Sequence, residues 1–155
     1  MPLPVILCIG SSGVSGDILG PLVGDLLRRR YNVKAFVYGC PERPVNGLNY
    51  TQYIEHIERV HHGSVVIAVD ACVGSRDDVG KIKFSPSGLT AGGALNKNLR
   101  RFGDLGVLGV VAPRQKDNLS ALMQVPFSFV DEMSRAAASG VVRILAALQA
   151  GGTIT

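Results

Sequence analysis

Two kinds of hydrophobic pattern alternate along this chain, and they predict two kinds of element. Short, continuous apolar runs rich in β-branched residues are typical of buried strands. Longer stretches in which apolar residues recur every three or four positions are typical of helices with one buried face. Strands are predicted at residues 5–9, 33–37, 64–69, 81–84 and 105–111, and a Gly-rich loop at 85–98. Helices are predicted to begin at Asp17, to cover residues 48–60, and to cover residues 128–150 with Ser128 as the N-cap.

The order of these elements predicts the fold class. Strands that alternate with helices build an α/β fold, and right-handed crossovers place the helices on both faces of a parallel sheet. We therefore expect a three-layer sandwich with a mostly parallel central sheet of about five strands, formed by residues 1–155 as a single domain. The run at 64–69 is the most continuously apolar, as in a strand that is covered on both sides. The lysines in the run at 81–84 suit an exposed edge strand.

Two aspartates follow predicted strands at places that such a sheet brings together. Asp17 follows the loop after the first strand, and Asp70 comes directly after the third. If these two strands are neighbours, the strand order reverses between them, and ligands bind at that edge of the sheet. Taken alone, either aspartate could be a cap of a helix or a turn. However, a carboxylate that ends a buried strand is costly unless it is paired or hydrogen-bonded.

A pair of carboxylates at one crevice can activate a water molecule. Two carboxylates a few ångströms apart cannot both ionise easily, so one of them keeps its proton. The charged carboxylate can then accept a proton from water, while the neutral one donates a proton to the carbonyl oxygen under attack. Because the two titrations would be coupled, the sequence does not assign the acid and the base to Asp17 or Asp70.

Composition and charge narrow the classes of function. The chain has 155 residues, a net charge of +4 and 3 cysteines, which lack the Cys-x-x-Cys spacing of many metal sites. Basic residues gather at 28–30 and at Arg100 and Arg101, without the pattern of a known nucleic-acid-binding motif. The apolar N-terminal run lacks a basic region and is too short for a signal peptide or a membrane span. We therefore expect a cytoplasmic protein that binds neither nucleic acid nor membrane.

Other catalytic arrangements fit the sequence less well. Cys72 lies at the predicted crevice, but His61 and His62 precede the third strand and so lie at its other end. A cysteine peptidase and a serine triad both need an imidazole at the crevice. The usual imidazole and thiolate ligands of zinc do not converge there either. The loop at residues 10–16 lies between a strand and a helix, as phosphate loops do, so nucleotide binding is a rival. That loop lacks the Walker lysine, and Asp17 would repel a phosphate.

Five segments carry a family resemblance. They are Cys-Ile-Gly-Ser at 8–11, Ser-Gly-Asp-Ile-Leu-Gly-Pro-Leu-Val-Gly at 15–24, Val-Tyr-Gly at 37–39, Pro-Val-Asn-Gly-Leu-Asn at 44–49 and Ile-Ala-Val-Asp-Ala-Cys-Val-Gly at 67–74. These segments resemble the YyaC-type spore protease family, which is related to the germination protease and the hydrogenase-maturation proteases. The likeness covers about residues 5–111 and fades in the last helix. Its most specific motif is Ser-Gly-Asp-x-Leu-Gly-Pro.

The resemblance implies a hydrogenase-maturation-protease-like fold and a peptidase active in the developing spore or mother cell. Two aspartates are the catalytic acids in the germination protease, and they match Asp17 and Asp70. In the maturation proteases the equivalent pair helps to bind nickel together with a histidine from a later loop. That loop, at residues 91–97 here, contains no histidine. Supporting or substrate-binding roles are expected for Gly10, Ser11, Gly16, Cys72, Gly92, Gly93 and Lys97.

These inferences lead to one main expectation and two alternatives. We expect an aspartic-type peptidase without a cofactor, which hydrolyses a protein or peptide substrate at the Asp17 and Asp70 pair. The first alternative is a hydrolase in which the same two aspartates bind a divalent metal ion. The second is a catalytically silent relative that binds a peptide in the same crevice. The sequence leaves the oligomeric state undetermined.

Overall fold

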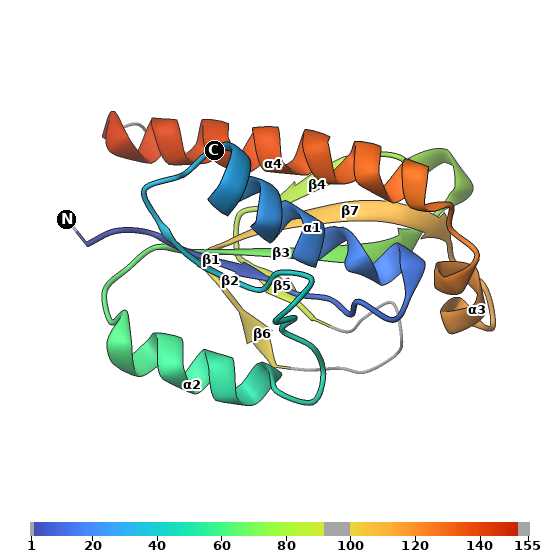
Figure 1. Ribbon diagram of the computed structural model, residues 1–155, viewed down its shortest axis with the longest axis horizontal. Helices are drawn as coiled ribbons and strands as arrows, with labels where there is room; N and C mark the ends of the chain where they lie inside the picture. Colours follow the sequence, from blue (N-terminus) through green and yellow to red (C-terminus); the bar gives the residue numbers. More distant parts are fainter. Residues whose placement is uncertain (1, 92–99, 152–155) are drawn as a thin grey trace.

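A five-stranded sheet in the order β2-β1-β3-β7-β4 forms the middle layer of the computed structural model, which describes residues 2–91 and 100–151 (Figure 1). Its first four strands run parallel, and β4 pairs antiparallel with β7 at one edge. The sheet consists of β1 (Val5–Cys8), β2 (Phe36–Tyr38), β3 (Val66–Gly74), β4 (Ile82–Ser85) and β7 (Leu105–Pro113). This confirms the predicted mostly parallel sheet, and the lysine-bearing strand is an edge strand.

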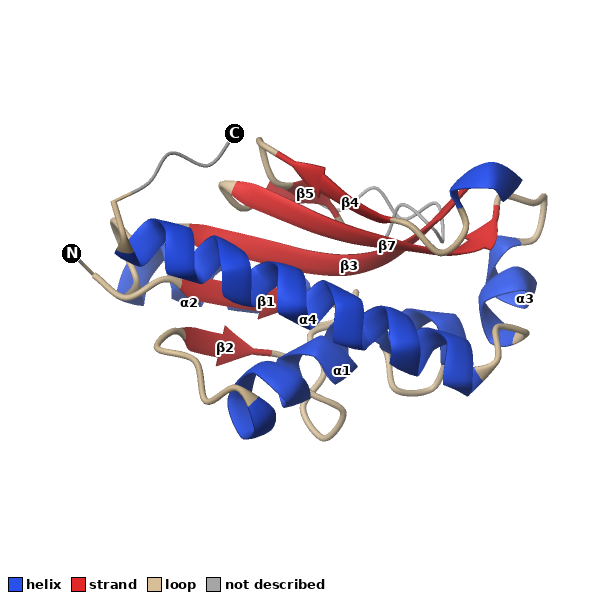
Figure 2. Cartoon of the chain, turned by 90° about the horizontal axis from the view of Figure 1, so that it is seen from above, coloured by secondary structure: helices blue, strands red, loops and turns tan. Residues whose placement is uncertain are grey.

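Helices cover both faces of this sheet and complete the three layers. α1 and α4 lie side by side on one face, and α2 covers the other face together with a ribbon of two short strands, β5 and β6 (Figures 1 and 2). The helices are α1 (Leu19–Asp25), α2 (Tyr50–Val60), α3 (Asn118–Met123) and α4 (Phe127–Gln149). Shorter elements are η1 (Ser15–Ile18), η2 (Leu26–Arg30), η3 (Arg76–Asp78), β5 (Leu89–Thr90) and β6 (Arg101–Phe102).

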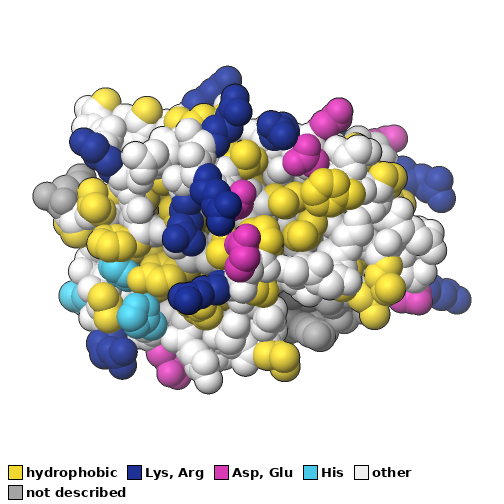
Figure 3. Space-filling model, in the orientation of Figure 1, with side chains coloured by type: hydrophobic (Ala, Val, Ile, Leu, Met, Phe, Trp, Pro, Cys, Tyr) yellow, Lys and Arg dark blue, Asp and Glu magenta, His cyan; other side chains and the backbone are white. Residues whose placement is uncertain are grey.

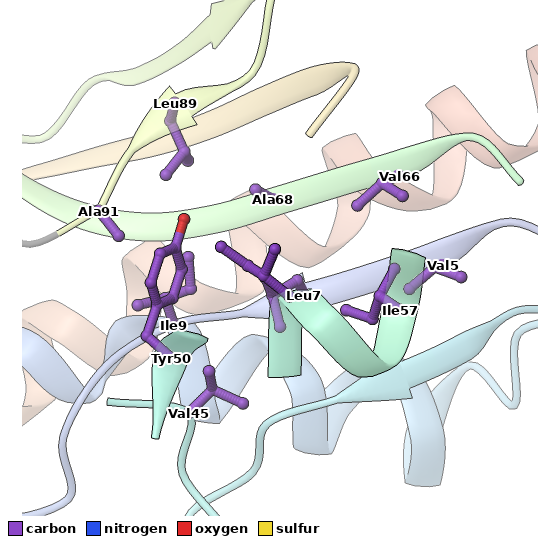
Figure 4. Packing of buried hydrophobic residues seen from close by; sticks show 11 residues of the cluster. Val5, Leu7, Ile9, Val45, Tyr50, Ile57, Val66, Ala68, Leu89 and Ala91 are labelled. Atoms are coloured by element: carbon purple, nitrogen blue, oxygen red, sulfur yellow. The ribbon is translucent and has the colours of Figure 1, made fainter. Parts of the chain in front are cut away.

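Successive residues of β1 pack into different layers of the core. Val5 and Leu7 belong to the apolar cluster beneath α2, whereas Ile6 and Cys8 belong to the cluster beneath α1 and α4. Figure 4 shows the cluster on the α2 side, where the ring of Tyr50 lies between its helix and the sheet. Because side chains alternate across a strand, a strand buried on both faces is apolar throughout. This explains the uninterrupted apolar runs in the sequence.

Several predicted boundaries were wrong. The second strand, predicted at residues 33–37, is β2 and covers only Phe36–Tyr38. β3 does not end at residue 69, because β7 pairs with it as far as Gly74, so Asp70 lies inside the strand. The first helix does not begin at Asp17: η1 begins at Ser15, and the α-helix begins at Leu19. The last helix begins at Phe127 with Pro126 as its N-cap, so Ser128 is already inside it.

Two further segments differ from the prediction. One lies between residues 85 and 91, and the other follows β7. The loop expected at residues 85–98 contains β5, and residues 92–99 lie outside the described residues. α3, which no pattern predicted, lies between β7 and α4. No helix in residues 2–91 and 100–151 combines the length and the apolar composition that crossing a membrane requires.

Candidate active site

The strand order of the sheet reverses between β1 and β3. β1 pairs in parallel with β2 on one side and with β3 on the other, with Cys8 opposite Val69. At such a switch point, a crevice opens outside the carboxyl ends of the two neighbouring strands. The first and third strands are thus neighbours, which is the condition on which the predicted crevice depended. Asp17 follows β1, and Asp70 lies on β3.

The loop after β1 folds back on itself and fixes the backbone of Asp17. The Ser11 amide donates to the Asp17 carbonyl oxygen at 3.1 Å, and the Gly10 amide donates to the Val45 carbonyl oxygen at 2.8 Å. A Cβ atom at Gly10 would lie only 2.1 Å from that same Asp17 carbonyl oxygen. The chain therefore approaches itself so closely that only glycine fits at position 10. This agrees with a supporting role for Gly10 and Ser11.

The 3-10 helix η1, which carries Asp17, is held between α3 and the sheet. The Ser15 hydroxyl donates to the Val125 carbonyl oxygen, and a Cβ atom at Gly16 would lie 3.0 Å from the Leu122 carbonyl oxygen. η1 also packs against β3, the strand that carries Asp70. Asp17 itself lies inside η1 and is at the N-cap of neither η1 nor α1. Asp17 is therefore not a helix N-cap, which was the simple alternative considered for it.

Asp70 is a buried carboxylate at the base of a cavity. Its side chain is 4% exposed, and one oxygen accepts a hydrogen bond from the Ala71 amide at 2.9 Å. The cavity has a volume of about 360 Å³. Its walls include Asp70, Cys72, Leu89, Thr90, Arg101, Leu108 and Arg114. A carboxylate on a buried strand that opens into a cavity can meet a bound molecule without being exposed to bulk solvent.

The charge of Asp70 affects two neighbouring side chains. Burial and then the negative charge of Asp70 raise the pKa of Tyr50 to about 12 and that of Cys72 to about 11. The Tyr50 hydroxyl donates a hydrogen bond to the Arg100 carbonyl oxygen at 2.8 Å. Both groups are therefore protonated at neutral pH. A neutral thiol at Cys72 is a poor nucleophile, which agrees with the sequence argument against a cysteine peptidase.

The histidines of α2 and its C-terminus lie at a different part of the sheet. The Nε2 atoms of His56 and His61 lie 3.3 Å and 2.6 Å from the Tyr38 hydroxyl on β2. β1 separates β2 from β3, the strand of Cys72. In residues 2–91 and 100–151, no group of three or more His, Cys, Asp or Glu side chains could hold a metal ion.

Several amides of the loop at residues 10–16 and of the helix after it donate to acceptors inside the protein. Besides the Gly10 and Ser11 amides, the Gly13 amide donates to the Ser11 hydroxyl oxygen and the Asp17 amide to the Val14 carbonyl oxygen. A phosphate loop instead directs its backbone amides at the ligand. The geometry thus does not favour the nucleotide-binding rival.

The structure brings together some of the predicted site residues and adds others. Gly10, Ser11 and Gly16 build the loop and helix that hold Asp17, and Cys72 lines the cavity of Asp70. Gly92, Gly93 and Lys97 lie outside the described residues. Tyr50, Thr90, Arg101 and Arg114 were missed. Arg114 could have been found, because it follows β7 at the same edge of the sheet.

Known proteins resemble this chain over most of its length. A family model described as a protein of unknown function (DUF1256) matches residues 3–140, which extends the likeness beyond residue 111 into α4. The uncharacterized protein YyaC of Bacillus subtilis (strain 168) is 37% identical over 120 residues. This match covers 77% of the chain but only 56% of that relative, so the chain spans about half of the relative's length.

Two solved structures show the same fold at low sequence identity. The [NiFe] hydrogenase maturation protease HycI from Thermococcus kodakarensis KOD1 matches with a TM-score of 0.56 and 19% identity, over 92% of each chain. A peptidyl-tRNA hydrolase from Acinetobacter baumannii matches with a TM-score of 0.64 and 11% identity, over 96% of this chain and 89% of its own. The predicted likeness to the maturation proteases is confirmed at the level of the fold.

Proposed function

Since the chain belongs to the DUF1256 family of proteins of unknown function and has the fold of a hydrogenase maturation protease, we propose that it is a peptidase. In this proposal Asp17 and Asp70 activate a water molecule that hydrolyses a peptide bond in a protein substrate. The resemblance to YyaC-type spore proteases further leads us to propose that the substrate is made or used during sporulation. The observation that carries the proposal is the buried Asp70 carboxylate, which lines a cavity and lies on β3, the strand against which the helix of Asp17 packs.

The chemistry needs one charged and one neutral carboxyl group. The charged group accepts a proton from water as the water oxygen attacks the carbonyl carbon, and the neutral group donates its proton to the carbonyl oxygen. The C–N bond of this tetrahedral adduct then breaks: the first group gives its new proton to the leaving nitrogen, and the second takes a proton back from a hydroxyl of the adduct. The products are a carboxylic acid and an amine, and both aspartates regain their starting protonation states. The cavity walls give the substrate polar partners, because Thr90 and Arg114 are exposed beside the buried Asp70. No covalent bond to the protein is formed in this reaction.

The donor set does not match a metal site of the kind proposed as an alternative. Asp17 and Asp70 offer carboxylate oxygens, which suit a hard divalent cation. A third His, Cys, Asp or Glu does not join them among the described residues. No step of the proposed reaction therefore passes through a metal ion. A chelator tests metal-assisted hydrolysis separately.

The proposal predicts new protein termini in an extract of sporulating cells. Purified protein is incubated with the extract, and new N-termini are labelled and identified by mass spectrometry. The wild type should generate a discrete set, and Asp70→Asn or Asp17→Asn should reduce its rate by about 10²-fold or more, the usual scale of acid–base catalysis. Asp77→Asn removes an exposed carboxylate on η3 and should leave the rate unchanged.

Each remaining result points to a different function. Unchanged cleavage by the Asp70→Asn variant would refute the aspartate pair. Loss of cleavage in EDTA, with recovery on adding one divalent ion, would replace the proposal with the metal-assisted reaction. If no new termini form but the protein retains a peptide from the extract, the silent binding relative is the correct interpretation.

A further inference from the structure

Among the residues that the structure describes, no strand pairs with the outer edge of β2. β2 lies at the end of the sheet, and β1 is its partner on the inner side. A groove of about 540 Å³ follows this outer edge, and every residue from 35 to 40 contributes to its wall. An open strand edge presents unpaired main-chain groups, to which another extended chain can add. The groove therefore has the shape and the position of a site for an added strand.

The backbone of β2 has groups that can pair with such a strand. The Phe36 amide donates inward, to the Pro4 carbonyl oxygen at 2.9 Å. In a parallel pair, alternate residues direct their amide and carbonyl groups to opposite sides of the strand. Val37 therefore directs its amide and its carbonyl group outward, toward the groove.

The side chains around this groove combine positive charge with aromatic surface. Arg28 at the end of η2 and Arg43 in the loop after β2 lie in the wall with Phe36 and Tyr53. The Phe36 side chain is 46% exposed. Figure 3 shows Lys and Arg side chains gathered on this face of the molecule, next to the histidines.

The two arginines differ from their neighbour Arg29. The Arg29 guanidinium forms ion pairs with Asp25 and Glu42. Arg28 and Arg43 form no ion pair with another residue in the described part of the chain, and the hydrogen bond of the Arg28 side chain is to the Cys40 sulfur. Arg28 also attracts Glu42 electrostatically, but it forms no ion pair with it, so both guanidinium groups can contact carboxylates of a bound molecule.

The groove ends beside the loop that holds Asp17. β2 continues into Gly39 and Cys40, and the Ser12 hydroxyl donates to the Pro41 carbonyl oxygen at 2.7 Å. The loop of residues 10–16 therefore contacts the segment that leaves β2. A chain bound along β2 would be led toward the carboxyl edge of the sheet, where Asp17 and Asp70 lie.

We propose that the outer edge of β2 binds an extended acidic segment of the protein substrate, which adds to the sheet as a further strand. Main-chain hydrogen bonds to Val37 give this segment its direction, and Arg28 and Arg43 select its carboxylates. Phe36 and Tyr53 contact the apolar side chains between the carboxylates. That the bound protein is a substrate rests on the proposed peptidase function, whereas the binding itself does not.

The test uses a fluorescein-labelled peptide of five Glu-Val repeats, with five Lys-Val repeats as the basic comparison, and reads binding by fluorescence anisotropy. The wild type should bind the acidic peptide, more weakly as salt rises, and should not bind the basic one. The double variant Arg28→Glu/Arg43→Glu should weaken binding at least tenfold. The matched control Arg59→Glu/Arg143→Glu makes the same charge change at exposed positions outside the groove and should weaken it less than twofold.

A second variant tests the strand addition itself. Proline is tolerated in an edge strand where its missing amide faces outward, so Val37→Pro removes the outward donor and should weaken binding about 3- to 10-fold. Circular dichroism checks that this variant folds. If it does not fold, the amide resonances of the wild-type protein are followed during titration with the acidic peptide, and that of Val37 should shift.

The outcomes separate this proposal from the proposed function. Asp70→Asn should bind the acidic peptide like the wild type, because Asp70 lies on β3 and not in the groove wall. Equal binding of both peptides, normal binding by the Arg28→Glu/Arg43→Glu variant, or an unshifted Val37 amide would each overturn the docking groove. Binding without any cleavage would leave the groove intact and refute the peptidase.

Discussion

Gly10 and Gly20 place the Asp17 segment against the end of β1 because neither residue has a side chain. A Cβ atom at Gly20 would lie 2.0 Å from the Ile9 carbonyl oxygen, as one at Gly10 would lie 2.1 Å from the Asp17 carbonyl oxygen. Contacts this short are sterically impossible, so a larger residue must push the helix and the strand apart. The position of the Asp17 backbone thus depends on the absence of a side chain at both Gly10 and Gly20.

Substitution Gly10→Ala should destabilise the protein and move Asp17. The added methyl group meets backbone atoms, which cannot rotate away, so we expect a loss of about 1–3 kcal/mol in the free energy of unfolding. Urea denaturation followed by circular dichroism measures this loss. Gly13→Ala is the control in the same loop, because its Cβ atom would have its nearest neighbour, the Ser11 hydroxyl oxygen, at 3.8 Å. Equal stability of the two variants would contradict the close approach at Gly10.

Individual site residues were predictable where the chain order alone places them at the sheet edge. Asp17, Asp70 and Gly10 follow from the positions of the strand ends, and the structure places them beside the switch point. Tyr50 was not predictable in this way. It comes from the first turn of a helix on one face, and no sequence spacing links it to Asp70. Such contacts between layers depend on packing, which a single sequence does not contain.

Among the elements, α3 was missed because it is too short to have a periodic pattern. It has six residues, and only Asn118, Ala121 and Leu122 are buried. β5 and β6 escaped prediction for the same reason, since each has two residues. Longer elements were predicted correctly in kind, because a run of five or more apolar positions distinguishes the period of a strand from that of a helix.

α3 matters for the site because its Leu122 packs under η1. This side chain is fully buried, and its terminal carbon would lie 3.0 Å from a Cβ atom at Gly16. Leu122→Ala should therefore leave a cavity beneath the Asp17 helix and cost about 2–5 kcal/mol in the free energy of unfolding. Chemical denaturation monitored by circular dichroism would measure it.

The matched control for Leu122→Ala lies on the same helix. Leu119 is 45% exposed, so Leu119→Ala should change the free energy of unfolding by less than about 0.5 kcal/mol. A loss of the same size in both variants would mean that α3 contributes only its helical structure. It would then have no specific role in supporting η1.

At the scale of the whole molecule, the general rules of α/β folds predicted the layers of the structure but not the length of its strands. Alternation of strands and helices predicted three layers, whereas the pairing of β1 with β3, on which the crevice depends, was a condition that the structure fulfils. The rules do not say how far two strands remain paired. β3 and β7 continue together through a bulge between Cys72 and Val73, and this extension places Asp70 inside the sheet.

The stability of the whole chain should depend on pH between about 5 and 7 through His61. Burial, and then the nearby His56, lower the pKa of His61 in the folded protein. In the unfolded chain a histidine titrates near about 6.5. As the pH falls below that value, the unfolded state takes up a proton that the native state does not yet bind, so the free energy of unfolding must fall. The Nε2 atom of His61 lies 2.6 Å from the Tyr38 hydroxyl oxygen, and this hydrogen bond holds the ring in place.

Thermal unfolding at several pH values between 5 and 7 measures this dependence. The wild type should lose stability as the pH falls through this range, and His61→Gln should lose less, since glutamine keeps a hydrogen-bonding side chain but has no charge to gain. The carboxylates with a lowered pKa, Glu42, Glu58 and Asp78, contribute at more acidic pH and do not interfere. His62→Gln replaces an exposed neighbour and should retain the wild-type slope. The same slope in wild type and His61→Gln would assign the pH dependence to another group and refute the role of His61.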